Sequence, residues 1–207
     1  MTRQRSDEQR KRQIRAAATR CFVRKGYAST RLLDIAREAG LSKGGVYFHY
    51  RAKEQLFHDI LDAHLQTLHD RWGFSPASDK PASETLERLI IAHLKTIEDE
   101  PDETRLFNLL VTMAAQDPVF RTKLDELFGL MRNLYASVIE RGLEDGSFAG
   151  LNAEQGASLV MSTISGFAAM SAADTEGKLP VEPEATAAHV VSQLAANRSA
   201  AQTAAVG

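Results

Sequence analysis

The sequence predicts an all-α protein, and three features of its 207 residues support that fold class. Apolar residues recur at the three- and four-residue spacing of an amphipathic helix along most of the chain. No segment alternates apolar and polar residues over the length of a β-strand. Glycine and proline are sparse, at 13 and 6 residues, and several of them fall between the periodic segments. About nine helices account for this pattern.

The first helix is expected to begin after Ser6, because Ser6 and Gln9 have the spacing of a capping box. It is expected to end at Lys25, since Gly26 suits a helix C-terminus. Its core-facing stripe consists of apolar residues at helical spacing, namely Ile14, Ala17, Ala18, Cys21 and Phe22. This stripe predicts that one side of the helix is buried.

The other helices are separated by glycine, proline and short polar stretches. Gly40, Pro101 and Gly146 each interrupt a periodic segment. An alanine-rich tail, 199–207, is expected to fray. The eight remaining helices are predicted at residues 31–39, 42–48, 53–72, 83–99, 102–115, 118–145, 153–172 and 184–197.

The charged residues are distributed unevenly. The chain has 25 Lys and Arg against 27 Asp and Glu, a formal net charge of −2. Residues 1–53 contain 14 basic and 4 acidic residues and so carry +10, which leaves −12 for the rest. A basic segment joined to an acidic body indicates a polyanionic partner. Charge alone does not exclude a solvated basic helix without a partner.

The composition also excludes several classes of protein. A single cysteine, Cys21, allows no intramolecular disulfide and no multi-cysteine metal site. The polar start of the chain does not resemble a secretory signal, and no uninterrupted apolar run reaches the ~18 residues of a membrane span. We therefore expect a cytoplasmic protein without a membrane segment.

In the segment LLDIAREAGLSKGGVYFHY, the spacing of alanine, glycine and serine is typical of a helix-turn-helix. Ala36 is small where the two helices would cross, and Gly40 stands in the turn, where a positive φ is easiest for glycine. Ser42 can cap the second helix. A helix-turn-helix places that second helix in the major groove of DNA. The spacing and the positive charge are independent indications, and both favour DNA binding.

A longer segment, GYASTRLLDIAREAGLSKGGVYFHYRAKEQL, resembles the N-terminal signature of TetR-family transcriptional regulators, and the similarity extends over residues 8–60. The resemblance implies a DNA-binding domain at 1–52, a ligand-binding and dimerisation domain at 53–198, and a flexible tail at 199–207. It also implies a homodimeric repressor that binds a palindromic operator and is released by a small-molecule inducer.

The resemblance assigns DNA contacts to matching positions. Thr30, Tyr47, His49 and Lys53 would contact phosphates, and Lys43 and Gly44 would lie against base edges or sugars. Arg31, where the family usually has a small hydroxyl residue, adds a long cationic side chain. The full set of predicted DNA-binding residues is Thr30, Arg31, Ser42, Lys43, Gly44, Gly45, Tyr47, His49 and Lys53.

Alternatives stay open for some of these residues. Tyr47 and His49 could pack in the domain core, since both residue types are intermediate in burial. Arg3 and Arg5 fall in an N-terminal arm, for which a disordered cationic tail is favoured over a reader of the minor groove.

The acidic body is expected to hold a small, largely apolar ligand. Two histidines interrupt apolar stripes at helical spacing, and pockets are mostly apolar with a few placed polar groups. For each residue taken alone, ordinary core packing is the favoured alternative. The candidate ligand-binding residues are His64, Leu68, Trp72, His93, Phe107, Asn108, Met113, Met131 and Tyr135.

A dimer interface is predicted from the helices at 118–145 and 153–172. The first repeats large apolar residues, and the second is rich in small ones, which let helices approach closely. An ordinary intramolecular helix pair is the alternative. Twofold DNA sites require a dimer, which favours the interface.

The function has three rivals, namely an enzyme, a helix-turn-helix protein without an inducer, and a helical adaptor for another protein, which would leave the +10 segment unexplained. An enzyme is disfavoured because the chain lacks a nucleophile elbow, a Walker loop, a zinc-protease motif and a dinucleotide fingerprint. His58 and Asp62 are too few for a metal site, so neither metal nor cofactor is expected. A helix-turn-helix protein without an inducer is the second rival, and a body too well packed to hold a ligand would favour it.

Overall fold

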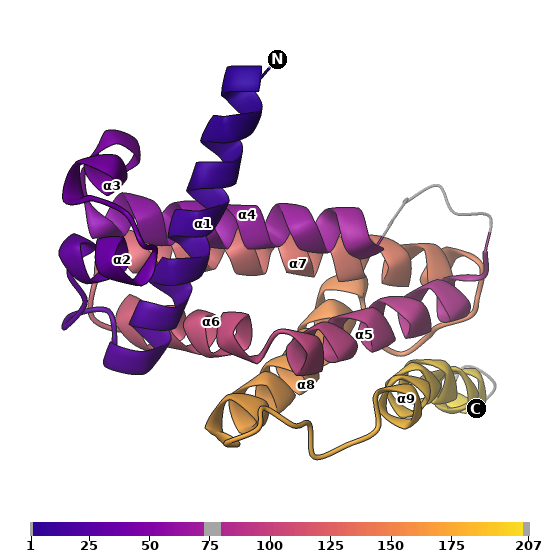
Figure 1. Cartoon of the computed structure of the whole chain (residues 1–207). Coiled ribbons are helices and arrows are strands. Elements are labelled where there is room, and N and C mark those ends of the chain that lie inside the picture. Colours follow the sequence, from indigo (N-terminus) through magenta and orange to yellow (C-terminus); the bar gives the residue numbers. More distant parts are fainter. Residues whose placement is uncertain (1, 73–79, 205–207) are drawn as a thin grey trace. The chain divides into compact units, whose positions relative to one another are not determined.

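The computed structural model describes residues 2–72 and 80–204, with side chains described for 5–66 and 80–195. These residues form nine helices and no strand, which confirms the predicted all-α class (Figure 1). The helices are α1 (Thr2–Lys25), α2 (Leu32–Glu38), α3 (Lys43–His49), α4 (Lys53–Trp72), α5 (Ala82–Asp99), α6 (Pro101–Ala114), α7 (Pro118–Glu144), α8 (Ala153–Ala173) and α9 (Pro183–Ala204).

The two ends of the chain differ from the sequence-based prediction. Helix α1 begins at Thr2 and not after Ser6, so Ser6 is not its N-cap and Arg3 and Arg5 belong to the helix. The preceding arginines and glutamine are good helix formers, which lets the backbone ladder continue past the capping signal. Helix α9 continues to Ala204, so the predicted tail is helical over residues 199–204, and 205–207 lie outside the described residues.

The chain divides into two compact units. Unit 1 consists of Met1–Leu68 and Asp102–Lys123, and unit 2 of His69–Pro101 and Leu124–Gly207. The functional domains predicted from the sequence are a different division, and their boundary at residue 53 stays a prediction.

The core of unit 1 is built on the predicted stripe of α1, because Ile14, Ala17, Ala18, Cys21 and Phe22 are all fully buried. An aromatic cluster extends this core. Phe22, Tyr27, Phe57 and Phe120 contact one another in tilted or edge-to-face pairs, with ring centroids 5.1–5.6 Å apart. Helices α1 and α4 are therefore joined by apolar packing within this unit.

The turn between α2 and α3 has the predicted geometry. Gly40 has a φ of +65°, and the Leu41 N–H donates to the Ala36 carbonyl over 2.8 Å. Ile35, Ala36 and Val46 are buried at the contact between the two helices. Because the apolar sides of these short helices face inward, the opposite side of α3 is left exposed.

Unit 2 is centred on α5, which packs against α8 and α9. Leu86, Ile90, Leu94, Tyr135 and Ile139 are among its fully buried side chains. Two glycines permit close contacts. A Cβ at Gly142 would overlap the ring of Phe148, and a Cβ at Gly156 would lie 3.1 Å from Ile139.

Helix α8 has the length and apolar composition of a membrane span, and among the described helices it alone does. Counting uninterrupted apolar residues did not reveal it, because serine, threonine and glycine are scattered along the helix. Its Gly156, Ala157, Val160 and Ile164 are buried in the core of unit 2. A core helix of a globular domain passes the same test, so this finding is weak support for a membrane segment.

Candidate functional site

The outer face of α3 consists of Lys43, Gly44, Tyr47 and Phe48, which are all exposed. These positions share one side of the helix, whereas Val46 on the other side is fully buried. The Lys43 ammonium lies over the Tyr47 ring, 5.3 Å from its centroid. The face therefore presents an ammonium, a phenol and an apolar ring to solvent together.

Phe48 is the residue of this face that was not predicted. Its side chain is 75% exposed, the highest value among the exposed large hydrophobic residues. A single exposed apolar residue needs no explanation, but Phe48 lies among polar groups on a helix already singled out for DNA contact. Its position one turn after Gly44 was the signal in the sequence that could have identified it.

The start of α3 is capped as predicted. The Ser42 hydroxyl accepts a hydrogen bond from the Gly45 N–H over 3.1 Å. An added Cβ at Gly44 would meet only the Ser42 hydroxyl, at 3.9 Å. Packing within the protein therefore does not require glycine at position 44. Because Gly44 has no side chain, a binding partner can approach the backbone closely at this position.

His49 at the end of α3 does not belong to the outer face. Its side chain is only 8% exposed, and its Nδ1 lies 3.4 Å from the Asp7 carboxylate of α1. The imidazole also contacts the ring of Phe48 edge-on. The structure therefore favours the packed alternative for His49, while Tyr47 is exposed and available.

Thr30 is fully buried. Its hydroxyl lies 2.8 Å from the Gly26 carbonyl and 3.2 Å from the Cys21 carbonyl, and so it ties the end of α1 to the loop before α2. A buried hydroxyl engaged with backbone cannot reach a phosphate. The predicted phosphate contact by the Thr30 side chain is thus corrected to a structural role.

Lys53 is also held by the protein itself. Its Nζ donates to the carbonyls of Tyr27, Ala28 and Thr30 over 2.7, 3.1 and 3.2 Å, and it lies 4.3 Å from the centroid of the Tyr27 ring. Partial burial lowers the pKa of Lys53. An ammonium has three donors, so a phosphate contact would require Lys53 to release these carbonyls. In this structure Lys53 forms a clamp that joins α4 to the loop before α2, and its phosphate contact stays a prediction.

The cations between Arg5 and Arg51 fall into two groups. In the first, the side chain is paired with a carboxylate: Arg15 with Glu8 and Asp59, Arg20 and Arg24 with Glu38, and Lys25 with Asp34. The hydrogen bonds from Arg20 and Arg24 lower the pKa of Glu38 to about 2.

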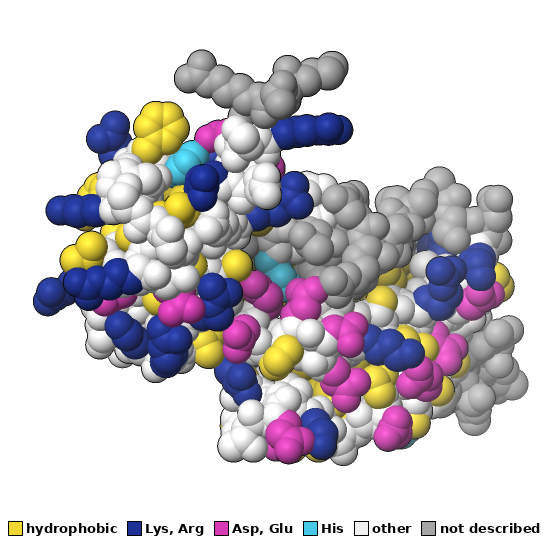
Figure 2. Space-filling view, viewed as in Figure 1, with side chains coloured by type: hydrophobic (Ala, Val, Ile, Leu, Met, Phe, Trp, Pro, Cys, Tyr) yellow, Lys and Arg dark blue, Asp and Glu magenta, His cyan; other side chains and the backbone are white. Residues whose placement is uncertain are grey.

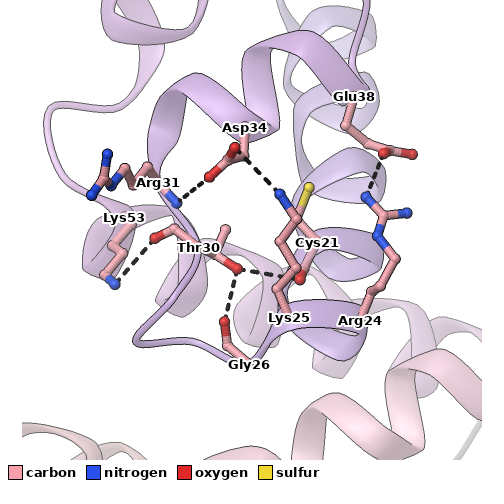
Figure 3. A network of polar contacts seen from close by, with 9 residues as sticks. All are labelled: Cys21, Arg24, Lys25, Gly26, Thr30, Arg31, Asp34, Glu38 and Lys53. Atoms are coloured by element: carbon pink, nitrogen blue, oxygen red, sulfur yellow. Dashed lines mark hydrogen bonds and ion pairs between the residues drawn. The ribbon is translucent and has the colours of Figure 1, made fainter.

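In the second group, no ion pair forms with any described carboxylate. Figure 3 shows one example, since Asp34 accepts the Arg31 backbone N–H while the Arg31 guanidinium points away from the network. Lys and Arg side chains gather around α1–α3 in Figure 2. The group with no described carboxylate partner consists of Arg5, Arg10, Lys11, Arg12, Arg31, Arg37, Lys43 and Arg51.

The candidate ligand residues of unit 2 come together. Tyr135 is fully buried, and its hydroxyl lies 2.9 Å from the Nδ1 of His93, with the two rings parallel. Burial raises the pKa of Tyr135 well above its usual range. Met131 packs against the same core. This arrangement is a polar pair, with Tyr135 buried and His93 partly buried, within apolar surroundings.

The candidate residues of unit 1 are partly buried. His64 Nδ1 lies 3.9 Å from the Glu103 carboxylate, and the Asn108 amide donates to the Thr104 carbonyl over 2.9 Å. Phe107 and Met113 are half-buried on α6. The side chains of Leu68 and Trp72 lie outside the described residues.

A groove of about 560 Å³ lies between α8 and α9 in unit 2. It is mostly apolar, with Leu159, Phe167, Val181 and Val190 in its walls, and none of the candidate ligand residues lines it. Met170, further along α8, is 55% exposed. Among the residues that the structure describes, no group of three His, Cys, Asp or Glu could hold a metal ion.

Known proteins resemble both parts of the chain. Residues 14–60 match the model of the bacterial regulatory proteins of the tetR family, and residues 82–199 match the C-terminal domain of BetI-type transcriptional repressors. The HTH-type transcriptional repressor KstR2 of Rhodococcus jostii is 30% identical over 139 residues, 67% of this chain and 68% of the relative.

Solved structures agree with the fold. A TetR transcription regulator from Haloarcula marismortui has a TM-score of 0.75 at 22% identity, covering 91% of this chain and 97% of its own. The regulator FadR from Bacillus subtilis, solved in complex with stearoyl-CoA, has a TM-score of 0.72 at 18% identity, covering 89% and 97%. These matches, together with the helix-turn-helix of α2 and α3, show that the chain belongs to the TetR family of bacterial transcriptional regulators.

Proposed function

We propose that this regulator is a one-component repressor that binds a duplex DNA operator through the outer face of α3. The observation that carries the proposal is the exposure of Lys43, Gly44, Tyr47 and Phe48 on one side of a capped helix. Lys43 can donate to the N7 and O6 acceptors of guanine in the major groove, and Phe48 can contact a thymine methyl group. Tyr47 and Arg31 supply donors for phosphates.

The operator contacts are made by fewer residues than the sequence indicated. Thr30, His49 and Lys53 hold the domain together through buried or shared polar contacts. Lys43, Tyr47, Phe48 and Arg31 remain available without breaking any such contact. Gly44 and Gly45 keep the backbone at the start of α3 accessible to the groove.

The repressor is proposed to act as a homodimer on a palindromic site. Two recognition helices related by twofold symmetry must match half-sites about 34 Å apart. The apolar groove between α8 and α9 supports a second copy of this chain as its occupant, because an isologous interface pairs the same surface of both subunits. Helix α8 belongs to both this surface and the interface expected from the sequence, whereas α9 takes the place of α7.

A small, largely apolar ligand is proposed to release the operator. The hydrogen-bonded pair of partly buried His93 and buried Tyr135 supports this, since it offers polar atoms next to an apolar core. The structural relative solved with stearoyl-CoA has a ligand that combines an acyl chain with polar groups. A coupling of ~1–3 kcal/mol between the two sites would give about 5–150-fold release. The relatives are regulators, so we propose a cytoplasmic protein without catalytic activity.

The test begins with selection of bound duplexes from a random pool by the full-length protein. The proposal expects a twofold-symmetric consensus, with altered base preference for Lys43→Ala. Selection of no sequence, or an unchanged preference in the variant, would contradict the assignment of α3.

The ligand is tested on the selected operator. Small molecules are screened for release of the labelled duplex, and the affinity of each active compound is measured by calorimetry with and without operator. Linkage requires DNA to weaken ligand binding by the same factor as the ligand weakens DNA binding. Equal ligand affinity under both conditions would favour a repressor without an inducer. That alternative has support in the structure, because His93 and Tyr135 already satisfy each other.

A further inference from the structure

Helix α1 extends well beyond the core that it helps to form. Its first buried residue is Ile14, and no residue from Arg5 to Gln13 is buried. Figure 1 shows the N-terminal turns of α1 passing beyond α2 and α3. A helical segment without a buried face gains little stability from packing. Packing within unit 1 therefore does not explain why α1 extends so far beyond Ile14.

The exposed segment is rich in cations that have no carboxylate partner. Arg5, Arg10, Lys11 and Arg12 form no ion pair with the acidic residues that the structure describes. The two acidic residues of the segment are engaged elsewhere, Asp7 with His49 and Glu8 with Arg15.

The second half of the same helix is different. Arg20 and Arg24 both pair with Glu38 over 2.8 Å, and Lys25 lies 3.3 Å from Asp34. The helix therefore has a neutralised half within the domain and a cationic half outside it. Ion pairs within the domain explain the cations of the neutralised half but not those of the cationic half.

Two contacts orient the cationic half toward the helix-turn-helix. Asp7 lies 3.4 Å from His49, the last residue of α3. Gln13 donates to the carbonyl of Ala39, which ends α2, and Arg10 donates to Gln13 over 2.8 Å. Arg10 and Lys11 follow Asp7 by three and four residues, so they lie on the same face of α1 as that contact.

We infer that this face of α1, through Arg10 and Lys11, is a second contact surface for the operator duplex and binds phosphates beside the groove that α3 enters. The inference rests on the proposed function of α3. Its occupant is duplex DNA because the surface is cationic and continuous with α3, and because the nearby carboxylates of Asp7 and Glu8 contact His49 and Arg15 and not Arg10 or Lys11.

The test compares two double variants that remove the same charge from the same helix. Arg10→Gln/Lys11→Gln changes the unpaired cations, and Arg20→Gln/Arg24→Gln changes paired ones. The affinity of each full-length protein for the selected operator is measured at several salt concentrations. Hydroxyl-radical footprints locate the protected sugars, and thermal unfolding verifies that each variant folds.

Four lost phosphate contacts in a dimer would lower the salt slope of Arg10→Gln/Lys11→Gln by about 3 to 4, since each contact contributes about 0.9. We expect this loss together with disappearance of the protected sugars next to those of α3. The control should keep its footprint and change its slope by less than about one.

Each other outcome has a distinct meaning. Equal losses of salt slope in both double variants would mean that only the net charge of the protein affects operator binding. This result would overturn the inference. An unchanged slope and footprint for Arg10→Gln/Lys11→Gln would overturn it while leaving the role of α3 intact. Failure of the unmodified protein to select any duplex would instead contradict the proposed function.

Discussion

The outer face of α3 and the His93–Tyr135 pair are the two parts of this protein that carry its proposed activities, and they are built in opposite ways. On α3, the side chains of Lys43, Tyr47 and Phe48 stand in solvent. In unit 2, Tyr135 is fully buried and its hydroxyl is bonded to His93. One region presents groups that have no hydrogen-bond or ion-pair partner among the described residues, and the other contains groups that already bond to each other.

This difference follows from the partner of each region. A phosphate or a base edge arrives with its own polar groups, so an exposed cation on a rigid helix gives up little protein contact when it binds. A ligand in unit 2 must replace a hydrogen bond in a low-dielectric core, where an unsatisfied group is costly. Binding at α3 is thus expected to leave the protein almost unchanged, whereas binding near Tyr135 is expected to rearrange it.

The largest expected effect comes from comparing two glycines. Gly142 is in the packed unit, and a Cβ there overlaps the buried Phe148 ring, so Gly142→Ala should lower the free energy of unfolding by up to ~3 kcal/mol. Gly44 on α3 has open space, so Gly44→Ala should raise it by up to ~1 kcal/mol and weaken operator binding. Urea unfolding measures both. Similar changes in the free energy of unfolding for the two variants would contradict the predicted difference in packing between Gly142 and Gly44.

The next effect concerns Phe48. Because this side chain is 75% exposed, Phe48→Ala should leave the free energy of unfolding unchanged and weaken operator binding by roughly 1 kcal/mol per half-site, at the lower end of the range for a base-pair contact. Fluorescence anisotropy with the operator measures the affinity.

The matched control for Phe48 changes the DNA. Replacing a contacted thymine by deoxyuracil removes only the methyl group. The unmodified protein should lose affinity on this substitution, and Phe48→Ala should not. Equal losses for both proteins would show that Phe48 does not contact the methyl group.

An effect of similar size, on stability and not on operator affinity, is expected for Lys53. Lys53→Met keeps the aliphatic stem beside Tyr27 and removes three charge-assisted hydrogen bonds to carbonyls, which should cost ~1–2 kcal/mol of stability because the carbonyls regain water. The salt slope of operator binding should not change. A slope lowered by about one per half-site with unaltered stability would restore the phosphate contact predicted from the sequence.

The smallest effect is the pH dependence of Glu38. The pKa of Glu38 is lowered to about 2 by hydrogen bonds from Arg20 and Arg24, from an unfolded value near 4.5. A depressed folded pKa means that this stabilisation is fully present above about pH 4.5 and is lost as the pH falls toward 2. The stability difference between the unmodified protein and Glu38→Gln should therefore shrink across that window in urea unfolding. A difference independent of pH would contradict the ion pairs.

Several elements were predictable because their causes are local. The stripe of α1 and the glycine turn before α3 depend on residues within a few positions of one another, and each was found where expected. The start of α1 was not, because a capping signal at Ser6 competes with helix formers on its N-terminal side. The groove between α8 and α9 joins residues distant in sequence, and no pattern along the chain indicated it.

The sequence by itself determined the all-α class, the helix-turn-helix and the separation of a +10 segment from a −12 body, because helical periodicity, turn chemistry and charge are properties of neighbouring residues. Only the tertiary structure decided which cations are free. Lys43 and Lys53 look alike in the sequence, yet one stands in solvent and the other donates to three carbonyls of a loop more than twenty residues away. The physical reason is that a polar side chain takes the partners which folding brings within its reach, and those partners are set by packing between helices and not by the order of residues.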